Sequence, residues 1–203
     1  MQYSDAAIVL LAAGKGRRFG GIKQLAMLAG EPIVHRAARL LLETGPPLIV
    51  VTGAHAKEVK AALDDLSVHR VRNNAWQEGM GTSLAAGFRH LLEHFDTVTG
   101  ALLCLADQPL LDSTLPIRML HRHAQATDRL LAVAHDGIAG PPVLFPRDCF
   151  AELAEWSGHA GAQAMLRREA LRLETFVVDL PPDIDTPADL DRAAMQLLQC
   201  EKG

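Results

Sequence analysis

The stretch Ile8-Val-Leu-Leu-Ala-Ala-Gly-Lys-Gly-Arg-Arg-Phe-Gly-Gly-Ile-Lys-Gln-Leu, ending at Leu25, decides the fold of this chain. An apolar run typical of a buried strand passes directly into a loop with four glycines: Gly14, Gly16, Gly20 and Gly21. Four cations share the same loop: Lys15, Arg17, Arg18 and Lys23. Glycines let backbone N–H groups approach an anion closely, and arginines pair phosphate oxygens in a bidentate way. The stretch therefore predicts a strand followed by a polyphosphate-binding loop.

Two common phosphate loops do not fit this stretch. Gly16 and Gly21 have the spacing of a P-loop, but Ile22 stands where that motif requires lysine. The dinucleotide fingerprint G-x-G-x-x-G fails because the glycine after Phe19 comes one place late, at Gly20. The acidic residue that would hold a ribose at the end of the second strand is also missing from residues 50–55. A nicotinamide oxidoreductase is therefore disfavoured.

The pattern that remains, L-A-A-G-x-G-x-R-F-G-x-x-K-x-L, resembles the signature of the nucleotidyltransferase superfamily, which joins a nucleoside triphosphate to a phosphorylated acceptor. Residues 73–87 read N-x-x-x-x-x-G-M-G-x-S-L-x-x-G and resemble the subgroup that transfers a nucleotide to the molybdenum-cofactor pterin. Segments beginning at Gly140 and Ser157 agree with that subgroup. Pro141, His159 and Gln163 replace residues usual there, which leaves the identity of the acceptor open.

Composition excludes several other classes of protein. The 203 residues carry a net charge of −4, so the cationic loop is a local feature, and we expect no nucleic-acid or membrane partner. The three cysteines are odd in number and far apart, which fits a reducing compartment rather than a disulfide framework. Neither a signal peptide nor an apolar span of about 18 residues is recognisable. We therefore expect a cytoplasmic protein.

Short apolar runs alternate with helical periods along the chain, which predicts an α/β fold. Strands are expected over 7–11, 48–51, 68–71, 101–105, 130–134 and 175–178. Helices are expected over 34–43, 56–65, 83–94, 115–126, 160–169 and 187–199. The resemblance implies a three-layer Rossmann-like nucleotidyltransferase fold, with a mostly parallel central sheet covered by helices on both faces. We expect one domain over 1–203, with a nucleotide-binding half at about 1–110 and an acceptor-binding half at about 111–203.

Two carboxylate segments complete the predicted site. An apolar strand delivers Asp107 at its C-terminal end, where a carboxylate can coordinate Mg²⁺. Asp183 and Asp185 precede Thr186-Pro187 at a predicted helix start, so they could simply serve the helix N-terminus. The resemblance favours Asp185 as the second metal ligand, because the superfamily motif has an acid or Asn just before Thr-Pro.

The resemblance implies a cytidylyltransferase that uses Mg²⁺ to couple CTP with the terminal phosphate of a phosphorylated pterin, with possible transient contact with a molybdoenzyme. It implies catalytic roles for Lys23, Arg17 and Asp107, and metal ligands in Asp107 and Asp185. The implied nucleotide-binding residues are Leu11, Ala12, Ala13, Gly14, Gly16, Arg17, Arg18, Lys23, Gly79, Gly81, Thr82 and Ser83. Ala13 favours CTP, because guanylyltransferases of this group tend to have glycine there. Trp76 and Met80 are expected to be packing residues.

Three alternatives stay open. The acceptor could be a sugar phosphate or methylerythritol phosphate, or the enzyme could be a molybdenum cofactor guanylyltransferase that uses GTP. A non-catalytic accessory protein that hands over the cofactor is the third, although binding alone would not demand both metal carboxylates.

Overall fold

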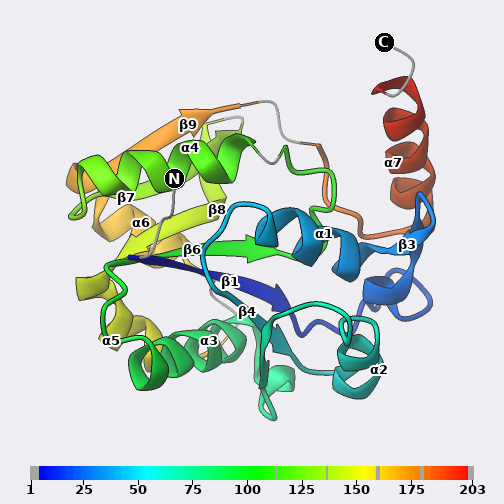
Figure 1. The fold of residues 1–203 in the computed structure, drawn as a ribbon, viewed down its shortest axis with the longest axis horizontal. Helices are drawn as coiled ribbons and strands as arrows, with labels where there is room; N and C mark the ends of the chain where they lie inside the picture. The colour runs from blue at the N-terminus through cyan, green and yellow to red at the C-terminus, as the bar shows by residue number, and fades with distance from the viewer. Residues whose placement is uncertain (1–4, 113, 136, 159–160, 179–180, 201–203) are drawn as a thin grey trace.

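A seven-stranded sheet with the order β5-β4-β1-β6-β8-β7-β9 forms the centre of the computed structural model, which describes residues 5–112, 114–135, 137–158, 161–178 and 181–200 (Figure 1). Its strands span Ala6–Ala12 (β1), Leu48–Thr52 (β4), His69–Arg72 (β5), Gly100–Leu105 (β6), Leu130–His135 (β7), Ile138–Pro146 (β8) and Leu173–Val177 (β9). Neighbouring strands are parallel, except that β8 runs antiparallel to β6 and β7. A small hairpin pairs β2 (Met27–Leu28) with β3 (Glu31–Pro32).

Helices cover both faces of the sheet, as the sequence predicted (Figure 1). The α-helices span Ile33–Leu42 (α1), Ala56–Ala61 (α2), Met80–His94 (α3), Thr114–Gln125 (α4), Phe150–Ala154 (α5), Gln163–Arg168 (α6) and Pro187–Cys200 (α7). Helices α1, α2 and α4 pack on one face, and α3, α5 and α6 pack on the other. The three-layer Rossmann-like α/β architecture is therefore confirmed.

The central strand β1 shows why its sequence is apolar throughout. Val9 and Leu11 belong to the core beneath α3 and α5, while Ile8 and Leu10 belong to the core beneath α1 and α4. A strand that is covered on both faces has no exposed side, so the alternation of apolar and polar residues disappears. Strand β1 pairs in parallel with β6, and Leu11 lies beside Leu105 in this pairing. The C-terminal ends of the two strands therefore lie at one edge of the sheet.

A third apolar cluster docks α7 against the β2–β3 hairpin. Leu28, Ile33, Ile184 and Ala193 are its buried members. Thr186 caps the helix: the backbone N–H of Asp189 donates to Thr186 Oγ1 at 3.3 Å, and Asp189 Oδ2 accepts from the Thr186 N–H at 2.7 Å. This reciprocal capping fixes where the segment before α7 turns, and with it the position of the neighbouring carboxylates.

Several predicted boundaries were wrong. Helix α3 begins at Met80 instead of residue 83, because Gly79 provides the extended turn before it. Helix α2 ends at Ala61 instead of 65, since residues 62–65 continue only as turns. Strand β8, which the list of expected strands lacked, is nine residues long and enters the sheet antiparallel. The predicted helix start at residue 160 lies outside the described residues, and the described helix α6 begins at Gln163.

No helix in the described part of the chain is long and apolar enough to cross a membrane.

His123 is a buried histidine on α4 whose surroundings favour the neutral ring. Its ring lies directly against Gly100, where a Cβ would stand 2.4 Å from Nε2. Its Nε2 lies 3.1 Å from Thr99 Oγ1, which itself donates to the Asp5 carbonyl at 3.0 Å, so Nε2 carries the proton. The other ring nitrogen, Nδ1, is buried without a partner. Protonation would therefore place an unpaired charge in the core.

We expect His123 to make the fold acid-sensitive. Burial lowers the pKa of His123, against a smaller opposing effect of Asp5. Below the ordinary histidine pKa, the unfolded chain then binds more protons than the folded one. The free energy of unfolding is therefore at its full value above that pKa and falls as the pH drops below it. The free energy of unfolding in urea, measured at pH 7.5 and pH 5.5, should fall less for His123→Gln than for the wild type. His121→Gln, on the exposed side of the same helix, is the matched control and should retain the wild-type loss.

Candidate functional site

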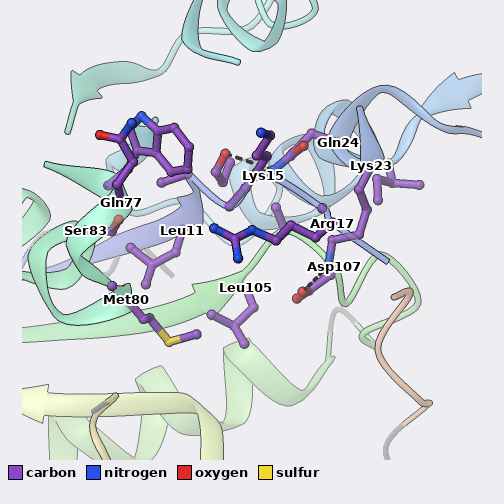
Figure 2. A pocket seen from close by; sticks show the side chains of 18 residues that line it. Leu11, Lys15, Arg17, Lys23, Gln24, Gln77, Met80, Ser83, Leu105 and Asp107 are labelled. Carbon is purple, nitrogen blue, oxygen red and sulfur yellow. Dashed lines mark hydrogen bonds and ion pairs between the residues drawn. The ribbon is translucent and has the colours of Figure 1, made fainter. Parts of the chain in front are cut away.

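A cavity of about 360 Å³ lies where β1 and β6 end (Figure 2). Ligands bind at this edge in open α/β sheets, because the loops that follow parallel strands converge there. The cavity brings together ten of the predicted residues: Leu11, Ala12, Ala13, Gly14, Gly16, Arg17, Lys23, Gly79, Ser83 and Asp107. The predicted phosphate loop and the predicted carboxylate on β6 therefore share one cavity.

Four predicted residues do not line the cavity: Arg18, Gly81, Thr82 and Asp185. Arg18 and Asp185 pair with each other at 2.7 Å beside it. Gly81 has a packing role instead, since its N–H donates to the Gly158 carbonyl at 2.9 Å and a Cβ there would meet the Ser157 carbonyl at 2.6 Å.

Eight lining residues were not predicted as ligands: Lys15, Gln24, Ile33, Trp76, Gln77, Met80, Leu105 and Ala106. Trp76 and Met80 were expected to be packing residues; the structure places both at the cavity, where Met80 is 48% exposed. Their position inside the motif of residues 73–87 was the signal that could have identified them. Figure 2 shows Met80 and Leu105 on one side of the cavity, with Arg17 pointing into it.

Gln24 holds the phosphate loop onto the end of β1. The turn η1 (Lys23–Leu25) places this side chain under the loop, where it is 4% exposed. Its Nε2 donates to the Gly14 carbonyl at 2.6 Å and to the Ala12 carbonyl at 3.3 Å. Both amide hydrogens are thus used on the backbone, which restrains the loop before any ligand arrives.

Gly16 lets the loop close over Lys23. Its backbone has φ +65°, and a Cβ there would stand 2.9 Å from the Lys23 Cβ. A glycine meets both demands, since an L side chain would be strained by the dihedral angle and crowded by the lysine.

Lys23 is the electrostatic centre of the site. Its Nζ donates to Asp107 Oδ2 at 2.7 Å and to Asp185 Oδ1 at 3.1 Å, and its side chain is only 11% exposed. Burial lowers the pKa of Lys23, but the charge and hydrogen bond of Asp107, supported by Asp185, outweigh it, so the pKa is raised overall. Lys23 therefore remains a cation in a partly dehydrated position.

Backbone contacts carry the 183–185 segment to the end of β6. The Ile184 N–H donates to the Asp107 carbonyl at 2.9 Å, and the Ile184 side chain is buried. Gln108 Nε2 donates to Asp183 Oδ1 at 3.0 Å. Burial, followed by the charge of Asp107, raises the pKa of Asp183. The carboxylates of Asp107, Asp183 and Asp185 thus lie close together, and their mutual repulsion favours a cation among them.

The carboxylates present fit a divalent metal ion. Asp107 Oδ1 is buried without a hydrogen-bond partner, so one carboxylate oxygen is left to accept a cation. No group of three or more His, Cys, Asp or Glu residues within the described ranges could hold a metal by itself. Magnesium sites that use substrate phosphates need only one or two protein carboxylates, which Asp107 and Asp185 can supply.

Asn73 organises the start of α3 on the other side of the cavity. Its Nδ2 donates to Thr82 Oγ1 and to Ser83 Oγ, at 2.9 Å each. The Thr82 hydroxyl also lies 2.9 Å from the Gly79 carbonyl, so its hydrogen-bonding capacity is used inside the protein. Ser83 lines the cavity and is the hydroxyl of this pair that can meet a ligand.

The acceptor-side segments show a mixed outcome. Gln163 Nε2 donates to the Ala139 carbonyl at 2.5 Å, so this side chain ties α6 to β8. Pro141 lies in β8 and precedes Pro142 in a cis peptide bond. His159 lies outside the described residues.

Comparisons with known proteins agree with this architecture. The profile of the MobA-like NTP transferase domain family matches residues 8–174. The nicotine blue oxidoreductase of Paenarthrobacter nicotinovorans is 35% identical over 197 residues, which cover 90% of each chain.

Two solved structures share the fold. The Rv0371c homolog from Mycobacterium sp. strain JC1 has a TM-score of 0.83 and 24% identity, with 98% of this chain and 100% of that chain covered. The manganese complex of Rv0371c from Mycobacterium tuberculosis H37Rv has a TM-score of 0.74 and 25% identity, with 95% and 98% covered. The chain belongs to the MobA-like NTP transferase domain family and is a nucleotidyltransferase of the MobA-like type.

Gly53 provides a test of how tightly the cavity wall is packed. A Cβ at this position would stand 2.6 Å from the Ala13 carbonyl oxygen and 2.8 Å from the Trp76 Cβ. Gly53→Ala should push these two wall segments apart and lower the free energy of unfolding by about 1–3 kcal/mol. Gly21→Ala is the matched control, because a Cβ there meets nothing within 4 Å. Equal unfolding midpoints of the two variants in urea would contradict this packing.

Proposed function

We propose that this protein transfers CMP from CTP to the terminal phosphate of molybdopterin, or of its molybdenum form, and releases pyrophosphate. The observation that carries the proposal is the placement of Lys23 between Asp107 and Asp185, beside the glycine loop. A cation and two carboxylates at a phosphate loop suit the chemistry of phosphoryl groups, where catalysis consists of positioning and charge neutralisation.

The proposed reaction is a direct displacement. An oxygen of the acceptor phosphate attacks the α-phosphorus of CTP while the bond from that phosphorus to the α–β bridging oxygen breaks, and pyrophosphate leaves. Lys23 would stabilise the charge that develops on the α-phosphate. Arg17, which points into the cavity, would hold the β- and γ-phosphates, with help from the amides of the glycine loop.

Asp107 and Asp185 would hold Mg²⁺. When bound, this ion would neutralise the triphosphate and act as a Lewis acid toward it. The unpartnered Asp107 Oδ1 is the atom of this chain that favours the assignment.

The choice of CTP rests on the wall formed by Ala13. This residue is fixed, because its carbonyl accepts the Ala54 N–H at 3.1 Å and its surroundings leave no space at Gly53. The Ala13 methyl group would narrow the pocket against a purine. Gly79 and Ser83 would face the base and ribose, and Ser83 and Gln77 are the polar side chains of that region at the cavity.

We extend the proposal to the organisation of the chain. The cavity residues fall within 11–107, which suits a nucleotide-binding half at about 1–110, and residues 111–203 would complete one catalytic domain. The pterin acceptor, a transient contact with a molybdoenzyme and a cytoplasmic location belong to the same proposal.

The name of the Paenarthrobacter relative describes an oxidoreductase, and this raises a second activity to test. The similarity over 90% of each chain is the observation in its favour. Against it, Thr52 to His55 after β4 carry no acidic residue for the ribose of a dinucleotide. We therefore expect CTP to bind at the cavity and a reduced nicotinamide dinucleotide to fail to compete with it.

A nucleotide screen tests the proposed reaction. With Mg²⁺ and molybdopterin, pyrophosphate release should be fastest with CTP, and calorimetry should show CTP bound roughly tenfold more tightly than GTP. Asp107→Asn should lose the release and keep the folded structure, as judged by its far-ultraviolet circular dichroism spectrum. A preference for GTP would overturn the assignment of the base. Release with CTP and a sugar phosphate, but not with molybdopterin, would overturn the assignment of the acceptor.

Steady-state kinetics separate the roles of the two loop cations. Lys23→Ala should lower kcat by about 10²- to 10³-fold with a smaller change in KM for CTP, because its contact strengthens as charge develops. Arg17→Ala should mainly raise KM through lost β- and γ-phosphate contacts. Losses confined to KM in both variants would mean that Lys23 only anchors the triphosphate.

A further inference from the structure

Lys23 occupies the position that a metal ion would need. The two carboxylates proposed as metal ligands reach the same ammonium group, at 2.7 Å from Asp107 and 3.1 Å from Asp185. These carboxylates are 84 and 162 residues from Lys23 along the chain, so three distant segments meet at its Nζ. The lysine side chain is 11% exposed, whereas Arg18, the other cation on Asp185, is 74% exposed.

Lysine and a divalent cation cannot use these oxygens together. Magnesium binds carboxylate oxygens at about 2.0–2.1 Å and holds its ligands in a nearly octahedral arrangement. An ammonium group between Asp107 and Asp185 fills that space and repels a second cation. The remaining buried oxygen, Asp107 Oδ1, offers a single protein ligand.

We propose that Lys23 is an internal competitor for the metal, and that binding of the nucleotide removes it. In the protein without nucleotide, the ammonium group neutralises the two carboxylates and keeps the metal affinity low. The α-phosphate then draws Nζ away from the carboxylates and leaves their oxygens to the ion. Nucleotide and metal consequently strengthen each other's binding, since a coupling between two sites is reciprocal.

The geometry of the loop allows this exchange. Gly16 and the η1 turn fix the backbone and Cβ of Lys23, while three methylene carbons, Cγ, Cδ and Cε, separate Cβ from Nζ and allow it to rotate. Lys23 lines the cavity and touches both carboxylates, so its Nζ needs only side-chain rotation to change partners. Arg18 remains paired with the second oxygen of Asp185, which keeps that carboxylate in place.

Manganese binding in the absence of any nucleotide tests the exchange. The full chain is titrated into Mn²⁺, and the free ion is followed by its electron paramagnetic resonance signal. Wild-type protein should bind weakly, and Lys23→Met should bind at least about tenfold more tightly because the competing charge is gone. Lys23→Gln provides a second variant if the methionine variant has a lowered melting temperature.

Matched controls separate local competition from net charge. Lys15→Met removes the same charge from an exposed position of the loop and should bind Mn²⁺ like the wild type. Lys23→Arg retains the cation and should also bind weakly. Adding Asp107→Asn to Lys23→Met should abolish the gain, which locates the ion at these carboxylates.

Equal Mn²⁺ affinity of the wild type and both neutral Lys23 variants would overturn the inference, and so would an equal gain in Lys15→Met. The inference rests on the proposed function for the metal ligands Asp107 and Asp185 and for the partner that Lys23 takes when it leaves. Because the titration contains neither CTP nor acceptor, its failure is distinguishable from failure of the proposed reaction.

Discussion

The burial of one ammonium group between two carboxylates is the constraint on which the site depends. Removing Lys23 Nζ from water is costly unless anions surround it, and here Asp107 and Asp185 lie within 3.1 Å. Asp107 is positioned by strand β6, which pairs with β1 in the sheet. The 183–185 segment, with Asp185, is positioned by the hydrogen bond from the Ile184 N–H to the Asp107 carbonyl. The docking of α7 then follows, because Ile184 is buried in the cluster that holds this helix.

Rigid supports surround this centre on both sides of the cavity. Gln24 uses both amide hydrogens on the backbone beneath the phosphate loop, and Asn73 uses its own on the hydroxyls at the start of α3. Neither interaction involves a ligand, so both persist when the cavity is empty. A site whose walls are held by such contacts loses little further freedom on binding, which favours a defined position for the triphosphate. Movement is thereby concentrated in the long side chains of the loop cations.

Much of the site could be predicted from the sequence because its residues follow strand ends. Parallel strands carry whatever follows them to one edge of the sheet, so Gly14 after β1 and Asp107 after β6 had to meet. The position of Trp76 and Met80 at the cavity was not predicted, because the direction of a side chain next to a turn depends on backbone angles, such as φ +122° at Gly79, that no periodicity reveals. Strand β8 was not among the strands expected from periodicity, because Pro141 and Pro142 interrupt the apolar pattern. Residues 143–146 of the same strand nevertheless pair antiparallel with β6.

The distribution of charge in the cavity has a consequence for the acceptor. Cations at the cavity come from the loop after β1, namely Lys15, Arg17 and Lys23, among the described residues that line it. Gln163 carries no charge, and its amide is committed to the Ala139 carbonyl. If the proposed transfer operates, the acceptor phosphate has to be neutralised largely by the same loop that holds the triphosphate. Met80 and Leu105 then offer the rest of the acceptor an apolar surface, so selection on this side would depend on shape more than on charge.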